Sequence, residues 1–167
     1  EPRRTVLIPN YVVTPDAEPP DAAAREPGLI LYAGQLIRRK RVDVLIDAVA
    51  GLPEEVRAGV TLEVVGDGVE LPALRQRAAG SPVVFRERMA HHDLLRRMGE
   101  CAIYAQASEM EGHPKTVLEA LSTGAPTLVA DSPGLASTVL HGVTGLRVQN
   151  TAAAFGQAIR ELLADPD

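Results

Sequence analysis

Two glutamates, Glu111 and Glu119, frame a stretch that reads Glu-Gly-His-Pro-Lys-Thr-Val-Leu-Glu. The first lies in a predicted loop, and the second lies about a turn and a half into the predicted helix that follows. The amides at the start of a helix lack intrahelical acceptors and favour anions. Carboxylates on both sides of such a helix start could therefore hold sugar, diphosphate and ribose in turn. The alternative, two ordinary helix charges, stays open on this spacing alone.

A cationic loop follows the first predicted core strand, where the sequence reads Gly-Gln-Leu-Ile-Arg-Arg-Lys-Arg over residues 34–41. A glycine turn that leads into cations is a place where a diphosphate could be neutralised. Lys40 could reach it as a point charge, or Arg39 as a planar fork. A solvated basic loop is the other interpretation of these residues. A nucleic-acid role is disfavoured, because four charges without a wider basic face make a poor footprint.

Two further turns end predicted strands. Residues 65–68 read Val-Gly-Asp-Gly, which is typical of a tight turn and is not the dinucleotide motif. Residues 131–134 read Asp-Ser-Pro-Gly before a predicted helix. Their amides could face an anion, or Asp131 or Ser132 could simply cap the helix.

The remaining reactive side chains indicate no separate chemistry. His91 and His92 lie next to each other, His113 is alone, and metal ligation needs several converging ligands. No serine lies in a Gly-x-Ser-x-Gly elbow. The single cysteine, Cys101, adjoins an apolar run and is predicted to be buried and inert.

Composition indicates an ordinary globular domain. The chain has 167 residues, 46% hydrophobic and 23% charged, with a net charge of −5. Aromatic residues make up only 3%, so the core must be aliphatic, as in a buried parallel sheet. This composition argues against single-strand nucleic-acid binding by base stacking. No apolar run has the length of a membrane span, and no signal-peptide pattern is visible.

Short apolar runs alternate with amphipathic segments from residue 29 onward. The predicted strands cover residues 29–33, 61–65, 83–85, 102–105, 127–130 and 146–148. The predicted helices cover residues 42–51, 71–79, 91–99, 114–123, 135–141 and 152–164. Pro114 suits the first turn of its helix, and Gly124 with Pro126 is a stop signal. Upstream, residues 6–8 form a candidate strand and residues 15–28 a Pro-rich loop.

This alternation predicts an α/β fold, a Rossmann-like three-layer sandwich with a mostly parallel sheet of about six strands. We divide the chain into a strand and linker segment at residues 1–28 and a Rossmann-like domain at residues 29–167. Ligands bind at the carboxyl ends of strands in such sheets. Most of the notable polar and glycine residues fall in the loops at those ends.

Five segments together resemble the C-terminal, donor-binding half of the GT-B fold, group 1 retaining glycosyltransferases. They read Leu-Tyr-Ala-Gly-Gln-Leu at 31–36 with Lys40 and 42–46 after it, Val-Val-Gly-Asp-Gly at 64–68, the stretch 111–120, Gly-Val-Thr-Gly-Leu at 142–146, and Pro-Asn at 9–10. Their order and spacing both agree with the family. The resemblance implies one half of a GT-B fold, with the N-terminal acceptor domain missing.

The resemblance also implies roles. Glu111 would hold donor-sugar hydroxyls and Lys40 would neutralise the diphosphate, and these two are the expected catalytic residues. Glu119 would bind the ribose. The remaining expected donor-binding residues lie in three loops: Gly34, Gln35, Arg39, Arg88, Met89, Gly112, His113, Pro114 and Lys115. Within this set, Arg88 and Met89 match where the base is read by backbone.

Departures from the family pattern leave alternatives open. Gln35 stands where an arginine is usual, Arg41 and Glu87 where glycine is usual, and Ser137 where a glutamate is usual. We expect transfer of a sugar from a nucleotide-diphosphate sugar to an acceptor hydroxyl, without a metal or other cofactor. This chain alone should be nearly inactive. The alternatives are a GT-B nucleotide-sugar epimerase and a non-catalytic binding module. We expect a cytoplasmic location, with contact to the inner face of the membrane left to the missing half.

Overall fold

The structure, a computed structural model, describes Val12 and residues 25–164. The strand predicted at residues 6–8 and most of the loop predicted at 15–28 lie outside the described residues. Within them the backbone forms six strands, β1 (Glu26–Ala33), β2 (Thr61–Val65), β3 (Val83–Arg86), β4 (Cys101–Gln106), β5 (Thr127–Ala130) and β6 (Leu146–Val148). Each strand contains, or coincides with, a predicted apolar run.

All six strands form one sheet in the order β3-β2-β1-β4-β5-β6. Every neighbouring pair is parallel. The α/β, Rossmann-like prediction is therefore confirmed, and the described sheet is wholly parallel rather than mostly so. The strand order reverses direction between β1 and β4, which are neighbours although two strands separate them in the sequence.

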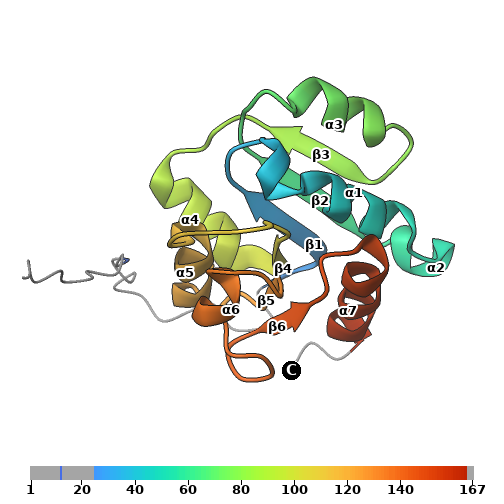
Figure 1. The fold of residues 1–167 in the computed structure, drawn as a ribbon. Helices are drawn as coiled ribbons and strands as arrows, with labels where there is room; N and C mark the ends of the chain where they lie inside the picture. Colours follow the sequence, from blue (N-terminus) through green and yellow to red (C-terminus); the bar gives the residue numbers. More distant parts are fainter. Residues whose placement is uncertain (1–11, 13–24, 165–167) are drawn as a thin grey trace, which may run out of the picture.

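Helices cover both faces of this sheet, as Figure 1 shows, with α1, α3 and α7 on one face and α4, α5 and α6 on the other. Their bounds are α1 (Val42–Ala50), α2 (Glu54–Arg57), α3 (Leu71–Arg77), α4 (His91–Glu100), α5 (Lys115–Ser122), α6 (Leu135–Thr138) and α7 (Ala152–Ala164). The central strands β1 and β4 are almost wholly buried from Leu29 and from Cys101 onward, and they lie in the middle of the hydrophobic core. Two tyrosines, Tyr32 and Tyr104, are its largest fully buried side chains.

The predicted helices differ from the structure in several places. The α2 helix and a 3-10 turn at Arg38–Lys40 went unpredicted, because four and three residues are too few to show a helical period. Pro114 is not in the first turn: its ψ of 81° is non-helical, and it is the cap residue before Lys115. The α6 helix ends at Thr138, because the buried Val139 is extended.

Candidate functional site

The loops that follow the strands are joined into one rim at the carboxyl edge of the sheet. Four backbone hydrogen bonds connect successive loops: Gly34 N–H to Val65 O at 3.0 Å, Leu36 N–H to Asp67 O at 2.8 Å, Glu109 N–H to Arg39 O at 2.9 Å, and Glu111 N–H to Pro133 O at 2.9 Å. This rim includes the reversal between β1 and β4, where open α/β sheets bind ligands. The predicted site residues therefore stand on connected backbone.

Two glycines permit the close approach of these loops. A Cβ on Gly66 would lie 1.9 Å from Gly34 O, and a Cβ on Gly134 would lie 1.9 Å from Glu111 O. Gly134 also has a φ of +86°, which disfavours any side chain. The turns at 65–68 and 131–134 thus place glycine where two backbones touch.

Lys40 and Glu111 form a close ion pair on this rim. The Lys40 Nζ atom lies 2.6 Å from Glu111 Oε1, and the two side chains are only 14% and 8% exposed. The Arg39 guanidinium lies 3.6 Å from Glu111 Oε2 and also donates to Met110 O. Two cations from the loop after β1 therefore converge on one carboxylate from the loop after β4.

Two buried polar residues complete the surroundings of this carboxylate. Gln106 Nε2 donates to Ser108 Oγ at 3.1 Å and lies 3.3 Å from Glu111 Oε1. Burial alone would raise the pKa of Glu111, but hydrogen bonds from Lys40, Ser108 and Gln106 outweigh it, and the pKa lies below its ordinary value. The carboxylate is therefore held ionised. Sequence reasoning missed Gln106 and Ser108, which carry no motif of their own.

The two buried tyrosines lie beneath the rim. Tyr32 Oη donates to Gln35 O at 3.0 Å, and Tyr104 Oη donates to Ala33 O at 3.3 Å. Burial, together with nearby Tyr104 and Glu111, raises the pKa of Tyr32 well above its ordinary value. The phenols are therefore neutral donors that fix the carbonyl at the end of β1 and one in the turn after it.

A second carboxylate, Glu119, lies on α5 and is only 5% exposed. Its Oε1 atom is 2.9 Å from His91 Nε2 and 3.5 Å from Lys115 Nζ. Sequence reasoning set His91 aside for lack of a metal or triad spacing. The contact joins residues 28 positions apart, and only the packing of α4 beside α5 brings them together.

The other predicted residues lie in the loops after β1, β3 and β4 or at the start of α5. Gly112 and His113 are exposed in the loop before α5, and Pro114 is buried. Gln35 is exposed on the turn after β1.

Arg88 and Met89 lie in the loop between β3 and α4. Arg88 borders a cavity of about 350 Å³ that Asp67 and Arg75 also line. Met89 packs against the core. Among the described residues, no hydrogen bond or ion pair joins either residue to Glu111 or Glu119.

The backbone at Arg41 shows why glycine is usual at this position in the family. Its φ of +50° makes it the one non-glycine residue with positive φ in the described part of the chain. Glycine would be unstrained there. The Arg41 guanidinium instead pairs with Asp43 at 3.1 Å and with Glu109 at 3.1 Å, which offsets part of the strain.

The structure also decides two smaller expectations and shows the surroundings of Ser137. Capping of α6 by Asp131 or Ser132 is wrong, because the cap residue is Gly134 and Ser132 Oγ instead donates to Ser108 O at 2.7 Å. Ser137 is exposed and donates to Gly134 O. Cys101 is buried, as predicted.

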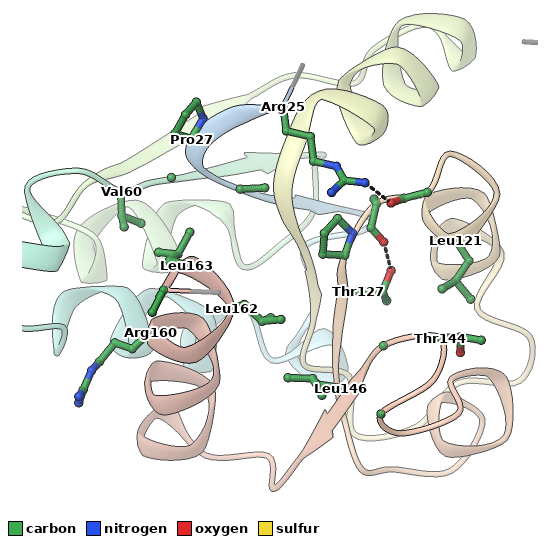
Figure 2. A pocket seen from close by; sticks show the side chains of 18 of the residues that line it. Arg25, Pro27, Val60, Leu121, Thr127, Thr144, Leu146, Arg160, Leu162 and Leu163 are labelled. Atoms are coloured by element: carbon green, nitrogen blue, oxygen red, sulfur yellow. Dashed lines mark hydrogen bonds between the residues drawn. The ribbon is translucent and has the colours of Figure 1, made fainter. Parts of the chain in front are cut away.

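A large cavity lies at the opposite, amino edge of the sheet. Figure 2 shows this cavity of about 1090 Å³, into which Leu146, Leu162 and Leu163 project. Its lining includes Pro27 and Thr127, near the starts of β1 and β5. The ion-paired residues described above do not line this cavity. The cavity and the cluster of charged side chains therefore lie at opposite edges of the sheet.

Two features are absent from the described residues. No group of three or more His, Cys, Asp or Glu could hold a metal ion in the part of the chain that the structure describes. Among the same residues, no helix is both long and apolar enough to cross a membrane.

Comparison with known proteins identifies the family. The family model described as "Glycosyl transferases group 1" matches residues 27–165. A GDP-mannose-dependent alpha-(1-6)-phosphatidylinositol monomannoside mannosyltransferase of Mycolicibacterium smegmatis is 32% identical over 90% of this chain and 44% of its own length. The lipopolysaccharide core biosynthesis glycosyltransferase LpsE of Rhizobium meliloti is 31% identical over 92% of this chain and 44% of its own length.

A solved structure agrees with these sequence matches. The crystal structure of Anabaena Alr3699/HepE in complex with UDP and glucose superposes with a TM-score of 0.75 at 25% identity, over 87% of this chain and 40% of that one. The chain thus spans less than half the length of these three relatives. On the family match and the two sequence relatives, the chain belongs to the group 1 glycosyltransferases.

Proposed function

We propose that this chain is the nucleotide-sugar-binding domain of a retaining glycosyltransferase. The observation that carries the proposal is the placement of two carboxylates at one edge of the sheet. Glu111, paired with Lys40, precedes the start of α5, and Glu119 lies on α5 itself. An anionic diphosphate between them would meet the first-turn amides of the helix and the Lys40 ammonium.

We assign the roles from this geometry and from the family resemblance. Glu111 accepts hydrogen bonds from hydroxyls of the donor sugar, and Glu119 accepts them from hydroxyls of the ribose. Lys40 neutralises the diphosphate, and Arg39 supplies the charge that Gln35 lacks. The backbone of the predicted loops completes the donor site: Gly34, Gln35, Gly112, His113, Pro114 and Lys115 near sugar and diphosphate, and Arg88 and Met89 at the base.

The chemistry asked of these residues is electrostatic. Transfer breaks the bond between the anomeric carbon and the diphosphate oxygen and forms one to the acceptor oxygen, whose proton is released. Negative charge therefore grows on the departing nucleoside diphosphate. A preorganised ammonium and oriented amides stabilise that charge without reorganising in the reaction. Retention of configuration at the anomeric carbon is what the resemblance implies.

The relatives support a nucleotide-sugar donor but do not agree on its base. The Anabaena protein is described in complex with UDP-glucose, and the mycobacterial relative is named as GDP-mannose-dependent. We therefore leave the base and sugar open. The acceptor would bind in a second domain, and this chain alone would transfer little. A cytoplasmic location and the domain division at residue 28 remain predictions.

Calorimetry with UDP, GDP and ADP tests the proposal on this chain. At least one nucleotide should bind, and Glu119→Gln should weaken it about tenfold or more, because a buried carboxylate that accepts hydroxyls contributes roughly 1.5–3 kcal/mol. The matched control is Glu161→Gln, an exposed glutamate on α7, which should bind like the wild type. Binding of none of the three nucleotides, or equal binding by the two glutamine variants, would refute a donor site at Glu119.

A further inference from the structure

His91 connects the predicted base loop to the predicted ribose carboxylate. It is the first residue of α4, two positions after Met89. Its side chain is 60% exposed, whereas the Glu119 side chain that it contacts is 5% exposed. A largely solvent-exposed ring therefore contacts a nearly buried carboxylate.

The chemistry of the pair fixes the state of the ring. A carboxylate accepts hydrogen bonds and does not donate them, so the 2.9 Å contact requires a proton on His91 Nε2. A hydrogen bond to a charged acceptor is stronger than one between neutral groups. Lys115 contacts the same oxygen at a longer 3.5 Å from the same helix as Glu119. His91 therefore holds Glu119 from a second element.

We propose that His91 is a positioning residue for the ribose of the nucleotide, an inference that rests on the proposed function. Its Nε2–H holds the Glu119 carboxylate in the orientation that receives the ribose 2′- and 3′-hydroxyls. An oxygen that accepts one hydrogen bond keeps a second lone-pair direction, so the contact leaves capacity for the diol. Because α4 also begins at the end of the β3–α4 loop, one helix start would place base and ribose together.

A purely structural role would look different. If His91 only satisfied a buried carboxylate, removing it would lower stability and weaken every nucleotide alike. If it positions Glu119 for the ribose, the loss depends on the ribose hydroxyls. The discriminating comparison is therefore between a ribonucleotide and its counterpart without those hydroxyls.

The experiment uses this chain and whichever of UDP, GDP or ADP binds it, beside the 2′,3′-dideoxy form of the same nucleotide. His91→Ala should weaken binding of the ribonucleotide about tenfold, the size expected for one hydrogen bond to a charged group. His91→Gln, which keeps an N–H donor at similar reach, should restore most of the affinity. Binding of the dideoxy nucleotide should change by less than about twofold in both variants, because the hydroxyls that Glu119 receives are absent.

His92→Ala is the matched control, since His92 is 83% exposed and contacts Asp93 rather than Glu119. It should bind both nucleotides like the wild type. If His91→Ala proves unstable, His91→Met, which keeps the bulk of the side chain without a hydrogen-bond donor, takes its place and should show the same selective loss. Thermal melting checks the folding of each variant.

Two outcomes overturn this inference on its own. One is an equal loss of both nucleotides in His91→Ala, and another is unchanged binding of the ribonucleotide. The two proposals fail separately, because Glu119→Gln can weaken binding while His91→Ala does not, and then only the role of His91 is lost. If no nucleotide binds the wild-type chain, the donor site and the inference built on it both fall.

Discussion

Replacing Lys40 by methionine should destabilise this fold although it removes no apolar contact. The Lys40 side chain is 14% exposed and its Nζ atom lies 2.6 Å from Glu111 Oε1, and the Glu111 side chain is 8% exposed. Methionine keeps much of the length and volume of the lysine stem. The change therefore isolates the loss of the cation from a nearly buried carboxylate.

The expected loss follows from what remains around Glu111. Stripping one partner from a buried ion pair costs about 3–5 kcal/mol, because the other charge is left uncompensated. Here Gln106 still lies 3.3 Å from the carboxylate and Arg39 lies 3.6 Å away. We therefore expect a smaller loss of about 2–3 kcal/mol. For a domain of this size that corresponds to a fall in Tm of roughly 5–10 °C.

A double-mutant cycle with Glu111→Gln measures the pair itself. Urea unfolding followed by far-ultraviolet circular dichroism suits a chain without tryptophan. We expect the double variant to lose less free energy of unfolding than the sum of the single variants. The coupling should be about 2 kcal/mol, within the range for residues in direct contact. Additive losses, or a Lys40→Met variant as stable as the wild type, would refute this account of the pair.

The same pair gives a pH dependence of known sign. The pKa of Glu111 lies below its ordinary value in the folded state, although burial opposes the shift. A depressed folded-state pKa contributes stability above the unfolded value of about 4.3, and that stability is lost as the pH falls through the folded value. The deficit of Lys40→Met relative to the wild type should therefore shrink as the solution is acidified. A constant deficit would show that Lys40 does not lower the pKa of Glu111.

Two further predictions concern a glycine and the single cysteine. Gly134→Ala should lower the free energy of unfolding by about 3 kcal/mol or more, because its Cβ would lie 1.9 Å from Glu111 O. Gly80→Ala is the control: its φ of +79° is similar, but nothing lies within 4 Å of its Cβ, so it should lose only about 1–2 kcal/mol to backbone strain. Equal losses in urea unfolding would contradict the close approach at Gly134. Burial raises the pKa of Cys101 to about 12, so a thiol reagent should label it only after unfolding, and rapid labelling of the native chain would contradict its burial.

Much of this fold could be predicted because its strands are short apolar runs, and the inner strands β1, β2, β4 and β5 are largely buried. The run at 61–65 reads Thr-Leu-Glu-Val-Val, and it became β2 with the predicted bounds. Its glutamate is the exception to the apolar pattern. Glu63 is 2% exposed and pairs with Arg97 at 2.9 Å and Arg86 at 3.0 Å, which no local pattern foretold. Local periodicity finds the strand, and only the packed neighbours show how its charge is satisfied.

The candidate site divides in the same way. Turn chemistry and loop position selected Lys40 and Glu111, since each follows a predicted strand whose carboxyl end faces the ligand edge. Neither the Lys40–Glu111 contact nor the contact of His91 with Glu119 follows from spacing, because the partners are 71 and 28 residues apart. Parallel strands bring such distant segments side by side, so the pairings are a property of the topology.

The two proposed donor carboxylates share a feature that bears on binding energetics. Each is almost buried and already accepts a hydrogen bond from a donor on another element, Lys40 for Glu111 and His91 for Glu119. In the ligand-free protein, carboxylates without a partner in such buried positions would carry a large desolvation cost. With these partners in place, a sugar or ribose hydroxyl that binds adds a hydrogen bond to a carboxylate that already has one. The cost of burying both charges is then met in folding, which leaves more of the contact energy to appear as affinity for the nucleotide.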